Sequence, residues 1–181
     1  MKKKILISIG VIIVVLIGAA AYRILTTRNL SPKGAITYSK NGLDISVTYG
    51  RPFKKGRIIF GPEDQSALVP YNKYWRLGAN EATEIAFSKD VTFGGKPVKS
   101  GTYRMYTIPG ENMWTVVLNT ELGKWGAFEA DHKLDVIKVE VPPTALTEPV
   151  EQFTIDFTEA SEQGVLLNFN WDKTKVSVPI K

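Results

Sequence analysis

The sequence contains no cysteine and only one histidine, His132, among its 181 residues. The absence of cysteine excludes disulfide bonds, thiol catalysis, cysteine-ligated zinc and iron–sulfur clusters. A site built from several histidines is excluded as well, and a Ser-His-Asp triad would have to use His132. The part of the chain that follows residue 30 is still long enough to bury a stable core without covalent cross-links.

Acidic residues are absent from the first 30 positions, which contain five basic residues: Lys2, Lys3, Lys4, Arg23 and Arg28. The rest of the chain therefore holds 18 basic and 18 acidic residues, and the whole net charge of +5 belongs to the N-terminal segment. A domain with no net charge has no long-range attraction for a polyanion. We therefore expect no nucleic-acid partner.

The N-terminal segment also holds the longest apolar run, which covers residues 5–25 and is interrupted only by Ser8, Tyr22 and Arg23. A helix of about 20 apolar residues is long enough to cross a bilayer. The sequence predicts a cytoplasmic basic tail over residues 1–4 and a single transmembrane helix over residues 5–25. Because basic flanks tend to stay in the cytoplasm, we expect the N-terminus inside the cytoplasmic membrane and the remaining residues in the periplasm.

A cleaved signal peptide is the alternative interpretation of this segment. Ala19, Ala20 and Ala21 offer a small-residue cleavage site. A signal peptide usually has a shorter apolar core of about 7–15 residues, so the length of this run favours an uncleaved signal anchor. Cleavage would leave a soluble periplasmic domain.

Beyond a polar linker over residues 26–33, apolar and polar side chains alternate in a series of short segments. This period of two is typical of half-buried strands, and Gly, Pro, Asn or Asp residues stand at the joints. The pattern predicts one all-β domain over residues 34–181, an antiparallel β-sandwich or jelly-roll-like fold. The expected strands cover residues 43–49, 83–88, 91–93, 96–98, 102–108, 114–119, 136–141, 153–157, 165–171 and 175–180.

Evidence for helices in this domain is weak. The best candidate covers residues 63–77, and Pro70 interrupts it. Residues 142–149 are the only linker-like stretch, but the strands after it would form a poor independent core. Asp172 and Lys173 form a connection short enough to join two antiparallel strands.

The densest cluster of chemically useful side chains lies in residues 74–83. Arg76 could hold a carboxylate or phosphate, Glu81 could act as a base, and Trp75 could stack on a sugar or planar group. The structural interpretation is that Arg76 pairs with Glu81, Asn80 holds the loop backbone, and Trp75 belongs to the core. The residue pattern leaves both interpretations open.

A second cluster, residues 50–57, contains four basic residues together with Gly and Pro. A loop of this composition could bind an anion, although it lacks the spacing of a phosphate-binding loop. Arg51 and Arg57 are its candidate ligand-binding residues. A solvated or internally paired loop is the alternative.

A third cluster contains Trp125, Phe128, Glu129, Asp131, His132 and Asp135. The acidic residues and His132 lie in a polar turn, so we expect no metal site there, and the sequence indicates no cofactor. Trp125 and Phe128 are expected to cover the core.

Several strings in the chain resemble a bacterial family catalogued as the domain of unknown function number 2911. The resemblance spans roughly residues 35–181 and is most specific over residues 75–83, Trp-Arg-Leu-Gly-Ala-Asn-Glu-Ala-Thr. It is also carried by residues 49–61, 69–71, 101–103, 108–110, 114–116, 125–128 and 171–176. The resemblance implies an exported or envelope-attached protein and supplies no activity and no catalytic residue.

These observations favour a non-enzymatic, membrane-anchored envelope protein whose outer domain binds a small anionic or sugar-like ligand or a partner protein. Its candidate binding residues are Arg51, Arg57, Trp75, Arg76, Asn80 and Glu81. One alternative is a hydrolase of glycans or esters that uses Glu81 and Arg76. The other is a purely structural module.

Overall fold

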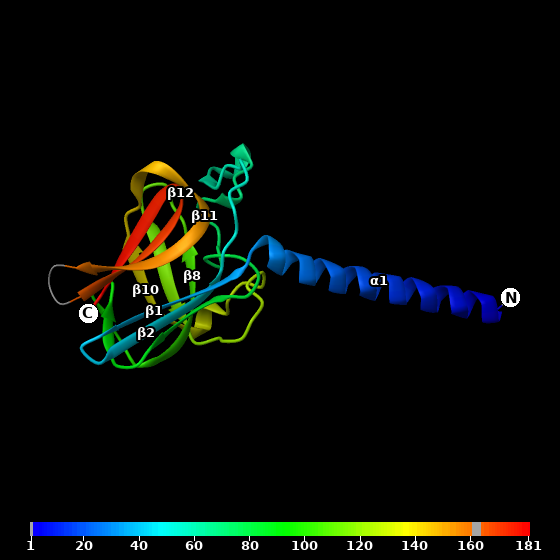
Figure 1. Ribbon diagram of the computed structural model, residues 1–181, viewed down its shortest axis with the longest axis horizontal. Coiled ribbons are helices and arrows are strands. Elements are labelled where there is room, and N and C mark those ends of the chain that lie inside the picture. The colour runs from blue at the N-terminus through cyan, green and yellow to red at the C-terminus, as the bar shows by residue number, and fades with distance from the viewer. Residues whose placement is uncertain (1, 161–163) are drawn as a thin grey trace.

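The chain begins with a long helix that projects from the rest of the molecule like a rod (Figure 1). The computed structural model describes residues 2–160 and 164–181, and this helix is α1 (Lys2–Leu30). Its stretch Ile7–Leu30 is long and apolar enough to span a membrane, and its most apolar window lies wholly outside the domain. Residues 26–30, expected to belong to a linker, instead continue the helix, because nothing before Pro32 interrupts its backbone hydrogen bonding.

The remaining residues form an all-β domain with antiparallel main sheets, as the alternation predicts. A six-stranded sheet has the order β1-β2-β5-β8-β9-β10, and a four-stranded sheet has the order β11-β12-β6-β7. The first contains β1 (Lys33–Lys40), β2 (Leu43–Gly50), β5 (Thr83–Phe87), β8 (Gly101–Ile108), β9 (Trp114–Asn119) and β10 (Asp135–Val141). The second contains β11 (Thr144–Ala160), β12 (Gly164–Ile180), β6 (Val91–Phe93) and β7 (Lys96–Val98).

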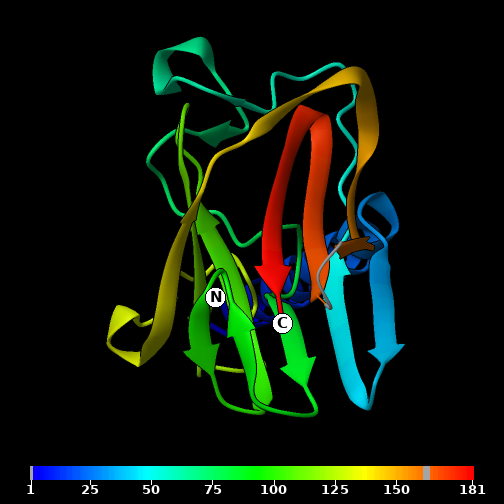
Figure 2. The same cartoon turned by 90° about the vertical axis from the view of Figure 1, so that its left-hand side faces the viewer.

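Strand β12 folds back on itself at the Asp172–Lys173 connection, as Figure 2 shows. Asp172 adopts a φ of 52° there, and the Ser177 hydroxyl donates to Oδ1 of Asn168 over 2.7 Å, which joins the two arms. The first arm pairs with β11, the start of the second arm also pairs with β11 at Thr144 and Ala145, and its end reaches β6. The short connection predicted at Asp172 and Lys173 is therefore present, although β12 continues through it.

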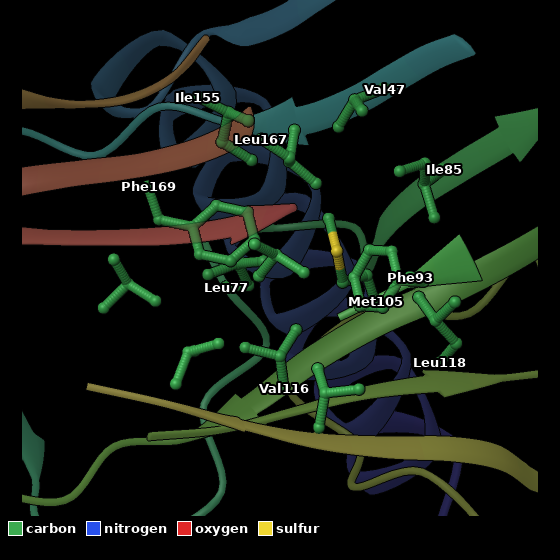
Figure 3. Packing of buried hydrophobic residues seen from close by; sticks show 14 of the residues in the cluster. Val47, Leu77, Ile85, Phe93, Met105, Val116, Leu118, Ile155, Leu167 and Phe169 are labelled. Carbon is green, nitrogen blue, oxygen red and sulfur yellow. The ribbon is translucent and has the colours of Figure 1, made fainter. Parts of the chain in front are cut away.

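The core lies between the two sheets (Figure 3). Ile85 and Phe87 of β5 face it together with Met105 of β8, while Leu167 and Phe169 of β12 approach from the other sheet. All five side chains are at most 4% exposed. The strict alternation of β5 therefore has a direct cause, because every second side chain enters this core.

Three segments differ from the prediction. Strand β1 was not expected, and β11 begins at Thr144, within the stretch expected to be linker-like. Residues 63–77, the best of the weak helix candidates, form no α-helix, and only Glu63–Gln65 forms a short 3₁₀ turn. That turn lies between two short parallel strands, β3 (Phe60–Gly61) and β4 (Val69–Pro70), whose pairing excludes a continuous helix.

Candidate functional site

A cavity of about 450 Å³ lies where the C-terminal end of α1 meets the domain. Four parts of the chain supply its wall: the last turn of α1, the loop after β2, the segment from β4 to β5, and the turn of β12. The lining residues are Thr27, Leu30, Ser31, Pro52, Phe53, Lys55, Arg57, Leu68, Val69, Trp75, Arg76, Gly78, Ala79 and Trp171. We call it the junction cavity.

Tryptophan side chains form the buried side of the junction cavity. Trp75 stacks on Trp171 with ring centroids 5.8 Å apart and an interplanar angle of 19°, and Trp114 and Phe153 pack against Trp75 edge-on. Two backbone hydrogen bonds with Thr107, of 2.8 and 2.9 Å, hold Trp75 in place. Trp171 is almost fully buried, and its Nε1 has no hydrogen-bond partner among the described residues. This wall is therefore rigid and retains one unused donor.

The loop that carries Arg76 packs backbone to backbone against the end of β2. A Cβ atom on Gly78 would lie 2.7 Å from the carbonyl oxygen of Gly50, and the φ of Gly78 is 146°. The Thr83 hydroxyl donates to the carbonyl oxygen of Leu77 over 2.7 Å. Only glycine fits at position 78, because both the conformation and the space exclude a side chain.

Arg76 is a half-buried cation that forms no hydrogen bond or ion pair with the residues that the structure describes. Its aliphatic stem packs on Gly126, where an added Cβ would lie 2.7 Å from Cδ of Arg76. Burial lowers the pKa of the Arg76 guanidinium, and the nearby Tyr74 offsets part of this effect. A partly desolvated charge without a partner is unfavourable. An anion in the junction cavity would remove this cost.

Two more cations line the same cavity. The Arg57 guanidinium is oriented by its own loop, because Nε donates to the carbonyl oxygen of Lys54 over 2.9 Å and Nη2 donates to that of Phe53. Lys55 is exposed at the rim. Among the described residues that line the cavity, none is acidic. The cavity thus combines three positive charges with an apolar wall.

The structure brings together Arg57, Trp75 and Arg76 of the six predicted residues and leaves the others outside the junction cavity. Glu81 lies in a neighbouring cavity of about 440 Å³, where it pairs with Arg28 of α1 at 2.7 Å. The structural interpretation in which Arg76 pairs with Glu81 is therefore wrong. Asn80 is buried and donates from Nδ2 to the carbonyl oxygen of Ser31 over 3.0 Å, so it holds backbone as expected.

Arg51, the sixth predicted residue, lines neither of these cavities. Its backbone N–H donates to the carbonyl oxygen of Pro32 over 2.9 Å, and its side chain lies against Gly34. Its Nε is buried without a partner among the described residues. The position of Arg51 indicates a role at the junction between α1 and β1.

Sequence reasoning missed a buried arginine on the outer face of the six-stranded sheet. Arg104 is 0% exposed and pairs with Glu121 at 2.9 Å, and it also donates to the Tyr74 hydroxyl and the carbonyl oxygen of Phe128. Burial raises the pKa of Tyr74, against the opposing effect of Arg104. These contacts tie the loop over residues 120–134 to the sheet. The only signal in the sequence was the position of Arg104 between two inward-facing residues of β8.

A second polar cluster lies beside it and surrounds Asp135. The Tyr106 hydroxyl donates to the Asp135 carboxylate over 2.9 Å and lies 2.7 Å from Nδ1 of His132. Burial alone would raise the pKa of Asp135, but hydrogen bonds from Asn119, Lys138 and Tyr106 outweigh it and lower that pKa. Burial and the Asp135 charge raise the pKa of Tyr106. Within the described residues, no group of three or more His, Asp or Glu could hold a metal ion.

Comparison with known proteins gives one match. A protein-family model described as protein of unknown function (DUF2911) matches residues 31–180. No curated protein and no solved structure matches the chain.

Proposed function

The chain belongs to the family of proteins of unknown function DUF2911, and from this premise we propose that its β domain binds a small anionic ligand in the junction cavity. Arg76 carries the proposal, because its half-buried guanidinium has no hydrogen-bond or ion-pair partner among the described residues and lines a cavity whose described lining residues include no carboxylate. Arg57 and Lys55 add positive charge at the mouth. Charge-assisted hydrogen bonds from such groups are about twice as strong as neutral ones.

The wall of the cavity narrows the class of ligand. Trp75 is 6% exposed and its ring is covered by other aromatic side chains, so it offers no free face for stacking on a sugar. Phe53, Leu30 and Leu68 supply apolar surface instead. These features favour an anion attached to an apolar or planar group over a neutral sugar.

We place this domain outside the cytoplasmic membrane, with α1 as a single-pass anchor and the N-terminus inside. The length and hydropathy of Ile7–Leu30 support a membrane span, and the lysines before it support this orientation. If the segment were cleaved as a signal peptide, the same domain would be periplasmic. Either location leaves an envelope protein that binds ligand without catalysis.

The two alternative functions have less support. A hydrolase that uses Glu81 and Arg76 would need both side chains at one substrate. The two side chains line different cavities, and Glu81 forms an ion pair with Arg28. A purely structural module would pair its loop charges internally, and Arg76 has no such pairing among the described residues. The unpaired arginine therefore favours binding over both.

The proposal is tested by titrating the full-length chain, in non-ionic detergent, with phenyl phosphate while tryptophan fluorescence is recorded. Trp75 and Trp171 line the junction cavity, so we expect a saturable change in emission. Arg76→Gln should weaken binding at least about tenfold, the effect of losing about 1.4 kcal/mol of charge-assisted hydrogen bonding. Phenol, which lacks the phosphate, should give no saturable change.

Lys89→Gln is the matched control, since it also removes one positive charge, and Lys89 contacts the carbonyl oxygen of Asn41 and does not line the junction cavity. Phenyl phosphate should bind this variant as it binds the wild type. The absence of saturable binding up to about 10 mM, a binding free energy weaker than about 2.7 kcal/mol, would refute the proposal. Equal affinity of wild type and Arg76→Gln would also refute it.

A further inference from the structure

The end of α1 is part of the junction cavity itself. Thr27, Leu30 and Ser31 line one side of it, opposite Arg76 and Arg57. The helix is held against the domain by the ion pair of Arg28 with Glu81 and by the hydrogen bond from Asn80 to Ser31. Figure 1 shows α1 leaving the domain from this end. Any bilayer crossed by α1 therefore faces the cavity.

The position of these wall residues along α1 sets the height of the cavity above a bilayer. The apolar run ends at residue 25, and the wall residues follow at positions 27–31. At 1.5 Å per residue they lie about 3–9 Å beyond the end of the run. Each headgroup layer of a bilayer is about 5–7 Å thick. The cavity would thus open at the level of the lipid headgroups.

The chemistry of the cavity matches an amphiphile at this level. Three cations that line it could contact a phosphate. Leu30 and Leu68 line the same cavity and are 55% and 43% exposed, respectively. Apolar side chains at the rim of a cationic cavity would contact the glycerol and the first acyl carbons of a lipid. A free inorganic anion would leave them exposed to water.

We infer that the ligand of the junction cavity is the headgroup of an anionic phospholipid from the bilayer that α1 crosses. This inference rests on the proposed anion site and names the source of the anion. Lipid binding would hold the domain close to the membrane surface, because the headgroup would bridge the loop of Arg76 and the end of α1.

The test measures lipid retained by the full-length chain in native mass spectra. The chain is released from non-ionic detergent micelles that contain equal amounts of phosphatidylglycerol and phosphatidylcholine. We expect one tightly retained phosphatidylglycerol per chain, preferred about tenfold or more over phosphatidylcholine. Arg76→Gln should abolish the preference. Lys89 is a cation beyond the opposite end of β5, where its Nζ donates to the carbonyl oxygen of Asn41. Lys89→Gln should retain the preference for phosphatidylglycerol.

Each outcome has a separate meaning. Equal retention of the two lipids, or a preference that survives Arg76→Gln, overturns the lipid assignment. If phenyl phosphate still binds through Arg76 in that case, the anion site stands and its ligand comes from solution. If neither phenyl phosphate nor phosphatidylglycerol binds, both the lipid assignment and the proposed function are wrong.

Discussion

Arg76 and Arg104 should respond in opposite directions to the same substitution by methionine. Methionine keeps an unbranched stem and removes the charge. Arg104 is fully buried and paired with Glu121, whereas Arg76 is half-buried and has no partner among the described residues. Stability should therefore fall in Arg104→Met and rise in Arg76→Met.

The structure sets the magnitudes. Breaking a buried ion pair costs about 3–5 kcal/mol. Glu121 is 22% exposed and lies 3.6 Å from Lys124, so the carboxylate left behind is partly compensated and we expect the lower end, about 3 kcal/mol. For Arg76→Met we expect a gain of about 1 kcal/mol, because removal of an unpaired, partly desolvated charge is stabilising. At about 2–4 °C per kcal/mol, the unfolding midpoint should fall by about 6–12 °C and rise by about 2–4 °C, respectively.

The assay is thermal unfolding of the full-length chain in detergent, followed by near-ultraviolet circular dichroism of the tryptophan cluster. Phenyl phosphate should raise the midpoint of the wild type, since a ligand of the native state stabilises it, and leave that of Arg76→Met unchanged. A fall in midpoint for Arg76→Met similar to that of Arg104→Met would refute the reasoning. Arg76 would then stabilise the fold.

Two further predictions concern the loop and the polar cluster. Gly78→Ala should cost about 2–4 kcal/mol in urea unfolding, because its φ of 146° is strained and its Cβ would meet Gly50; Gly56→Ala, at a φ of 70° in open space, should cost only about 1 kcal/mol. Equal losses in both variants would contradict the close approach of the two loops. The lowered pKa of Asp135 contributes stability above the unfolded value of about 3.9, and that contribution is lost as pH falls through the folded value. As the pH falls from about 5 to about 2, the thermal unfolding midpoint of Asp135→Asn should therefore decrease less than that of the wild type. Equal decreases in the two proteins would contradict this role of Asp135.

The strands were predictable where one face enters the core. Strand β5 has the expected start because Thr83, Ile85 and Phe87 are all buried. Strand β1 is an edge strand, and most of its inward positions are only half-buried, so Ile36 and Tyr38 give a weak alternation. An edge strand that buries little apolar surface leaves little pattern in the sequence.

The candidate site was predictable in its parts but not in its assembly. The clusters that contain Arg57 and Arg76 stood out by composition, and they meet because β2 pairs with β5. Linear spacing could not show that pairing, nor that Glu81 would find its partner 53 residues away in α1. Arg104 was missed because an outward position on a strand is normally solvated, whereas here Tyr74 and the loop over residues 120–134 cover it.

The connection between α1 and β1 is too short to let the helix and the domain move independently. Only residues 31 and 32 separate Leu30 from Lys33, and Ser31 and Pro32 are both held by hydrogen bonds to the domain. In a bilayer the domain would share whatever tilt the helix adopts. Helix tilt follows the mismatch between an apolar segment and the local hydrocarbon thickness. In a thinner membrane the helix and the domain would therefore tilt further from the membrane normal. The angle between the junction cavity and the lipid surface would depend on membrane thickness.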